Sequence, residues 1–281
     1  MPLAGPPISL HAKDLLRGLP VFSPVAIKLM DLVSDENVSL KQVAKLFSVD
    51  PVLAGQVLRL ANSGMYGRQI AVQSVLQAVA RLGLTNITRI AITAALSCGF
   101  PRATSPWRHA CWRHSIAAAL IADHVGIVSL GLDFGYTAGL LHAVGQLALY
   151  QHAPRDYPGF LDAVDRANAD VLERERERFG ADHAQLGSLM LSEWGLPSPL
   201  RVAISDRHAP SGADTLAAAV QAGCYYAEAQ GFGPCGCRSG LCDVHPGRFG
   251  KTLDRYLLDV LAIEVNRIEW SLSAAQRPEE I

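Results

Sequence analysis

The chain has 281 residues, of which 49% are hydrophobic and 18% charged, and 25 Lys and Arg against 26 Asp and Glu leave a formal net charge of −1. This composition excludes disorder over most of the chain, and it lacks the cationic excess of proteins that bind nucleic acid regardless of sequence. No apolar run is long enough to span a membrane. Residues 1–10 carry no secretory pattern, so we expect a cytoplasmic protein with reduced thiols.

Helix start signals recur at helix-length intervals in the first third of the chain. Proline follows two of the cap residues at the first helical position, and Gln42 stands at capping-box spacing from another. The predicted N-caps are Ser23, Ser39, Asp50 and Ser74. The helix after Ser74 should end at Gly83, and a further helix should start at Thr85.

The remainder of the chain follows the same helical pattern. Ser105 and Pro106 predict a long helix to about Gly126, and further helices are expected over 133–150, from Asp182 to Trp194, from Pro199, over 214–230 and over 247–271. No strand-like alternation is present, so we expect an all-α fold. We expect an N-terminal helical subdomain over 1–104, a second over 105–230, and a Cys-rich loop with a C-terminal helix over 231–281.

Several segments, in this order along the chain, resemble the HDOD domain, the HD-related output domain of bacterial signalling proteins. They are Leu19–Ala26, Asp50–Leu53, Leu58–Ser63, Met65–Gly67, Ala78–Leu84, Trp112–Ser115, Ala138–His142 and Trp194–Pro197. The resemblance covers roughly residues 15–230. It implies a small N-terminal helical bundle packed on a C-terminal bundle derived from HD-type metal-dependent phosphohydrolases.

An HD-type site needs two histidines and two aspartates around a divalent metal ion, which generates hydroxide and polarises the phosphoryl group. The resemblance places His114 and His142 at the two histidine positions. The residue after His142 is Ala143 instead of aspartate, and no carboxylate stands near Gly223, where the last aspartate should fall. We therefore expect a vestigial site without phosphohydrolase activity.

Two further histidines, His183 and His208, match positions at which the family carries polar residues around this pocket. All four histidines stand among apolar residues of predicted helices. They are interpreted either as remnant core histidines that hydrogen-bond internally, or as the lining of a retained small-ligand or phosphate pocket.

A Gly-rich segment near the C-terminus concentrates four potential metal ligands: Cys235, Cys237, Cys242 and His245. Three thiols and one imidazole could hold a structural zinc ion tetrahedrally, with Cys224 as a substitute ligand. Free thiols and a redox or disulfide role remain the alternatives.

The alternating run Glu173–Arg178 places Glu173 near Arg176 and Glu175 near Arg178 on a helix. This pattern is typical of a solvated face with weak ion pairs.

The composition and the resemblance together favour a non-catalytic bacterial signalling protein that acts through protein–protein interaction. Met65 and Tyr66, in a Gly-rich loop, are candidate partner contacts, or alternatively fill the seam between the two helical halves. The apolar excess also allows a homo-oligomer. The partners would be signalling proteins, with no role for a membrane.

Two other functions remain open. One is an HD-type phosphohydrolase with relocated metal ligands. The other is a DNA-binding regulator, because residues 40–62 could form a helix-turn-helix whose second helix offers Gln56, Arg59 and Asn62 to base edges. That helix is mostly apolar, so we expect no nucleic-acid binding.

Overall fold

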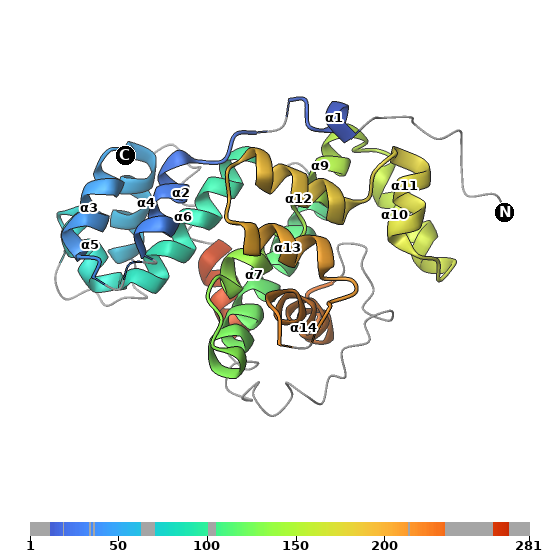
Figure 1. Ribbon diagram of the computed structural model, residues 1–281. Helices are drawn as coiled ribbons and strands as arrows, with labels where there is room; N and C mark the ends of the chain where they lie inside the picture. The colour runs from blue at the N-terminus through green and yellow to red at the C-terminus, as the bar shows by residue number, and fades with distance from the viewer. Residues whose placement is uncertain are drawn as a thin grey trace. The chain divides into compact units, whose positions relative to one another are not determined.

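The computed structural model describes residues 12–18, 20–33, 35, 37–62, 71–100, 105–212, 214–233 and 261–269 (Figure 1). Every regular element in these ranges is helical, and they contain no strand. The predicted all-α fold class is confirmed. Within the same ranges, no helix combines the length and the apolar character that a membrane crossing requires.

The chain forms two compact units. One comprises Met1–Pro20 and Arg102–Ala262, and the other comprises Val21–Pro101 and Ile263–Ile281. The structure therefore differs from the expected grouping of residues 1–104, because the chain before Val21 belongs with the unit that follows residue 101.

Two long-range hydrogen bonds explain this difference. Nε2 of His152 lies 2.6 Å from the carbonyl oxygen of Leu15 in α1 (Ala12–Leu15), and Nε1 of Trp194 donates to the carbonyl of Pro20 over 3.0 Å. Leu15 is also fully buried. Contacts between residues so far apart in the chain leave no trace in local spacing.

In its described residues, the unit formed by Val21–Pro101 and Ile263–Ile281 includes α2 (Pro24–Val33), α3 (Leu40–Ser48), α4 (Pro51–Ala61), α5 (Val75–Leu82) and α6 (Leu84–Gly99), and residues 263–269 are helical as well. The predicted capping box of Ser39 and Gln42 is confirmed, and the predicted N-cap Ser74 forms a capping box as well, with Gln77. Gly83, with φ of 77°, ends α5 as predicted. The apolar faces meet in one core that includes Leu29, Phe47, Val57, Val79 and Ile87.

The other unit is built around α7 (Pro106–Val125), whose predicted N-cap Ser105 accepts from the backbone of Arg108. A π-helical turn, Gly126–Leu130, continues it. The remaining helices are α8 (Gly135–Leu141), α9 (Val144–His152), α10 (Tyr157–Arg166), α11 (Val171–Phe179), α12 (His183–Glu193), α13 (Ser198–Asp206) and α14 (Leu216–Ala229). Both α8 and α14 pack directly on α7, which is buried along most of its length.

The helix expected over 133–150 is instead two helices. The break falls at His142 and Ala143, where Ala143 has φ of −95° and ψ of 6°. The prediction of one continuous helix was wrong because apolar periodicity continues across the break. The interruption places His142 at the end of α8 and not in the middle of a longer helix.

Candidate functional site

Close packing brings two helices of this unit, α8 and α14, against α7. A Cβ added at Gly139 of α8 would lie 2.5 Å from Cα of Ala119, and one added at Gly223 of α14 would lie 2.5 Å from the carbonyl oxygen of Ala118. Only glycine allows the backbones to approach so closely at these two points. His114, one turn before Ala118 on α7, therefore lies near the end of α8 and the middle of α14.

The backbone holds both histidines of the predicted HD positions in one tautomer. Nδ1 of His142 lies 2.6 Å from the carbonyl oxygen of Gly139, and Nδ1 of His114 lies 3.3 Å from that of Phe232. A carbonyl oxygen can only accept, so in each ring Nδ1 carries the hydrogen and donates it. Nε2 of each neutral imidazole is left with a lone pair.

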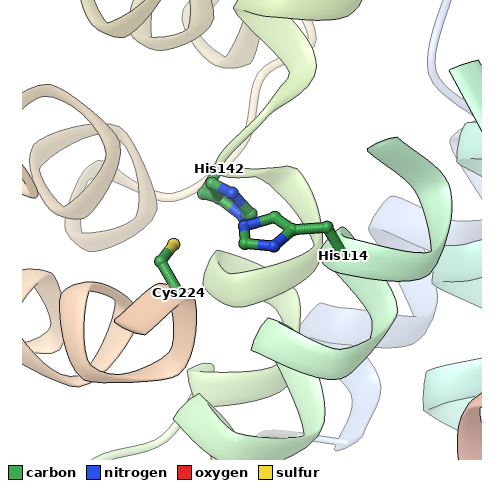
Figure 2. Close-up of side chains that lie close together, drawn as sticks. All are labelled: His114, His142 and Cys224. Carbon is green, nitrogen blue, oxygen red and sulfur yellow. The ribbon is translucent and has the colours of Figure 1, made fainter. Parts of the chain in front are cut away.

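Cys224 of α14 lies next to these two imidazoles (Figure 2). One nitrogen of His114, one nitrogen of His142 and the sulfur of Cys224 all lie within 4.8 Å of one another. The two rings meet edge to face, with centroids 5.2 Å apart. The HD pattern would have its last aspartate near Gly223, where this sequence has none. The next residue, Cys224, supplies a thiol at this point. The sequence did not predict Cys224 as a residue of this pocket, although it directly follows Gly223.

A hard-metal site of the HD type does not fit the residues present. Ala143, which follows His142, is completely buried, and its methyl group stands where the HD pair has its aspartate. Among the described residues, the group of potential ligands here is His114, His142 and Cys224, with no carboxylate. Magnesium and manganese prefer oxygen ligands, whereas two imidazoles and one thiol suit softer transition metals.

A second pair of histidines is joined to a buried carboxylate. Nε2 of His183 lies 2.9 Å from Nε2 of His208, and Nδ1 of His183 lies 2.5 Å from Oε2 of Glu175. The same oxygen accepts from the backbone N–H of His183, and Oε1 accepts from the hydroxyl of Tyr157 over 2.6 Å. The result is a hydrogen-bonded chain through α10, α11 and α12 to His208, just after α13. The sequence did not predict Glu175 or Tyr157 as residues of the site.

The predicted solvated face over Glu173–Arg178 is therefore partly wrong. Glu173 is exposed as expected, but Glu175 is completely buried. Arg176 donates to Asp182 over 2.7 Å, and Arg174 pairs with Glu177 over 2.6 Å. Charge alternation does not indicate which member of the run faces the protein interior, so the buried glutamate could not be distinguished.

Burial keeps the four histidines neutral. Loss of hydration lowers the pKa of His114 from 6.5 to about 4, with a smaller effect of the Arg207 charge. Burial, followed by the charge of Arg207, also lowers the pKa values of His142, His183 and His208. Burial raises the pKa of Glu175 to about 7, although Tyr157 and the backbone of His183 stabilise its charged form. At neutral pH the imidazoles can therefore act as ligands or hydrogen-bond partners without first losing a proton.

The remaining predicted site residues lie outside the described part of the chain. These are the candidate zinc ligands Cys235, Cys237, Cys242 and His245, and the candidate partner contacts Met65 and Tyr66. The zinc site and the partner contact at these positions stay predictions.

The HDOD domain family model matches residues 19–210 of the chain. An uncharacterized protein of Treponema pallidum (strain Nichols) is 24% identical over 205 residues, which cover 69% of this chain and 38% of that protein. The chain thus corresponds to well under two thirds of the length of this relative.

Three solved structures share the fold. An HDOD domain protein from Geobacter sulfurreducens has a TM-score of 0.65 at 22% identity, covering 96% of this chain and 97% of that one. A protein from Marinobacter aquaeolei VT8 assigned to signal transduction has a TM-score of 0.68 at 23% identity, covering 98% and 64%. A protein from Shewanella amazonensis SB2B assigned to the phosphohydrolases has a TM-score of 0.64 at 23% identity, covering 93% and 97%.

The family match covers more than half of the chain and includes the positions of His114, His142, His183 and His208. The solved structures agree with the all-helical architecture over nearly the full length of the chain. The resemblance inferred from the sequence motifs is confirmed: the chain belongs to the HDOD domain family.

Proposed function

We propose that this HDOD chain is a bacterial signalling protein that acts by binding other proteins and does not hydrolyse phosphate esters. The observation that carries the proposal is the fully buried methyl group of Ala143 at the HD position. A hydrolytic HD site needs carboxylates to hold a hard metal and to polarise its bound water. The neighbouring group of His114, His142 and Cys224 includes no carboxylate among the described residues.

Family membership supports a role in signalling. The Marinobacter protein of the same fold is assigned to signal transduction, whereas the Shewanella protein is assigned to the phosphohydrolases. One fold therefore accompanies both assignments, and the residues of the site have to decide between them. In this chain the donor set favours signalling over hydrolysis.

Two side chains, one within α4 and one directly after it, weaken the DNA-binding alternative. Gln56 is only 7% exposed, so its amide lies in the core of the helical unit. The side chain of Asn62 donates to the carbonyl of Val72 over 2.8 Å and accepts from its N–H over 2.7 Å. Two of the three side chains that would contact base edges are thus used inside the fold.

Hydrolysis can be tested with the purified full chain and its His114→Ala/His142→Ala double variant. The substrates are p-nitrophenyl phosphate, a nucleoside monophosphate and a cyclic dinucleotide, each with magnesium, manganese or zinc. We expect both proteins to release phosphate at the same background rate. Metal-dependent turnover by the wild type that disappears in the double variant would establish the phosphohydrolase alternative.

Partner binding can be tested by immobilising the wild type, Tyr66→Ala and Ile127→Ala as baits for lysate of the source bacterium. Tyr66 is the contact expected from the sequence, and Ile127 is a 55% exposed apolar control. We expect a lysate protein that binds the wild type and the control variant and binds Tyr66→Ala weakly. After this partner is purified, it should bind the wild type directly. If the wild type retains nothing above the empty support, the interaction role is contradicted.

A further inference from the structure

We propose that His114, His142 and Cys224 form a binding site for a soft divalent metal ion, of which zinc is the best-fitting example. The site lies in the position of the vestigial HD pocket but uses a different donor set. It is separate from the zinc site expected from Cys235 to His245, and it goes beyond the proposed signalling function.

The spacing of the three ligand atoms fits one ion. Zinc lies about 2.0–2.1 Å from histidine nitrogen and about 2.3 Å from thiolate sulfur. Tetrahedral ligands at these lengths are about 3.5 Å apart. The two nitrogens and the sulfur already lie within 4.8 Å of one another, on three helices that are packed tightly together. Side-chain movements that shift each ligand atom by about 1 Å would bring all three to a common ion.

The hydrogen bonds of the two imidazoles are of the kind that metal-binding histidines make. Such a histidine donates its second ring N–H to a carboxylate or carbonyl oxygen, which fixes the ring and directs the other nitrogen to the metal. Here the carbonyls of Gly139 and Phe232 accept from Nδ1 of His142 and His114, respectively. In this tautomer, Nε2 of each ring is the nitrogen that carries the lone pair a metal ion needs.

Cys224 decides which metals the site selects. As a thiolate it restores one of the negative charges that the absent carboxylates would have supplied, and it binds zinc or cobalt in preference to magnesium. His114 and His142 are buried, and Cys224 is of intermediate burial as a whole residue. Three protein ligands leave a fourth tetrahedral position for water or another small ligand.

The test uses cobalt(II) as a spectroscopic substitute for zinc, added to the chelator-treated full chain. The chain carries Cys237→Ser, which removes a ligand of the separate zinc site expected from Cys235 to His245. We then expect one ion per chain, visible tetrahedral bands and a thiolate-to-cobalt charge-transfer band, with zinc displacing cobalt and millimolar magnesium having no effect. In this Cys237→Ser background, Cys224→Ala should abolish the charge-transfer band and weaken binding at least about tenfold. Cys111→Ala is the matched control, because Cys111 is a buried cysteine of α7 outside the ligand group.

Two further variants keep the result decisive. Cys224→Asp should still bind cobalt but without the charge-transfer band, and it should bind manganese more tightly than the wild type does. Cys237→Ser by itself should leave in place the band that depends on Cys224. A band that survives Cys224→Ala and disappears in Cys237→Ser would place the ion in the C-terminal segment and overturn the proposal.

The absence of any cobalt band in the wild type would overturn it as well. Circular dichroism and thermal unfolding with chelator present identify a variant that has failed to fold. These readouts do not depend on activity, so phosphate release would contradict the proposed signalling function without affecting the metal site.

Discussion

Glu175 of α11 and His183 of α12 form a hydrogen bond of 2.5 Å between Oε2 and Nδ1, and both side chains are completely buried. The chain turns between the two helices at Gly180, with φ of 80°, so the backbone N–H of His183 reaches the same carboxylate oxygen over 2.8 Å. A buried carboxylate that accepts from three donors orients the imidazole and joins neighbouring helices. His183 in turn contacts His208.

Glu175→Gln should lower the free energy of unfolding by about 1–3 kcal/mol, because an amide cannot accept from Tyr157 and from both donors of His183 at once. Urea unfolding at about pH 8, above the raised pKa of Glu175, measures the loss. The matched control is Glu173→Gln, an exposed position on the same helix, which should change stability by less than about 0.5 kcal/mol. Equal effects of the two variants would contradict the role given to the buried carboxylate.

The chelator-treated protein should lose stability as the pH falls from about 6.5 to about 4. The pKa of His114 drops from 6.5 in the unfolded chain to about 4 in the fold, so in this window the unfolded chain binds a proton that the folded protein does not. The stability that neutral His114 contributes is therefore fully present above pH 6.5. It declines as the pH falls, by about 3 kcal/mol once the pH reaches about 4. His142, His183 and His208 act in the same direction.

Glu175 acts in the opposite direction. Its pKa is raised to about 7, so the fold takes up this proton before the unfolded chain does and gains stability as the pH falls from about 7 to 4.5. Four histidines against one glutamate leave a net loss. Urea titrations between about pH 7 and pH 4 should show a shallower fall for His114→Gln than for the wild type.

Gly139→Ala should destabilise the protein by about 1–3 kcal/mol or more, because the new Cβ meets the α7 backbone at 2.5 Å from Cα of Ala119. Gly159→Ala in α10 is the matched control. A Cβ there has no neighbour within 4 Å, and alanine should stabilise the helix by about 0.4–1 kcal/mol. Thermal unfolding distinguishes the two, and a neutral Gly139→Ala would mean that α7 and α8 need not approach so closely.

Asn62→Ala should destabilise the unit formed by Val21–Pro101 and Ile263–Ile281 by about 1–3 kcal/mol. The variant removes both hydrogen bonds to Val72, whose backbone groups are then left without a side-chain partner. Asn62→Asp keeps the acceptor for the N–H of Val72 but not the donor, and should recover part of the loss. If Asp and Ala are equally destabilising, the acceptor contributes nothing.

The sequence predicted the helices most accurately where local chemistry defines their ends. Ser39, Ser74, Ser105 and Asp182 are all N-caps in the structure, each with its side chain accepting from the backbone three residues later. A cap involves residues that are already neighbours along the chain, so the pattern and the structure coincide. The break at His142 and Ala143 had no such local signal.

What the sequence by itself determined is the all-helical fold class, the family, and the loss of aspartate after His142. The motifs follow the family's order along the chain, and the sequence itself has Ala143 where the HD pair has its aspartate. Only the tertiary structure decided that Cys224 lies beside His114 and His142, and that Glu175 is buried against His183. Both contacts depend on how helices pack against one another. Gly139 and Gly223 allow α8 and α14 to approach α7 closely, and Gly180 turns the chain between α11 and α12. Neither effect follows from a repeating pattern in the sequence.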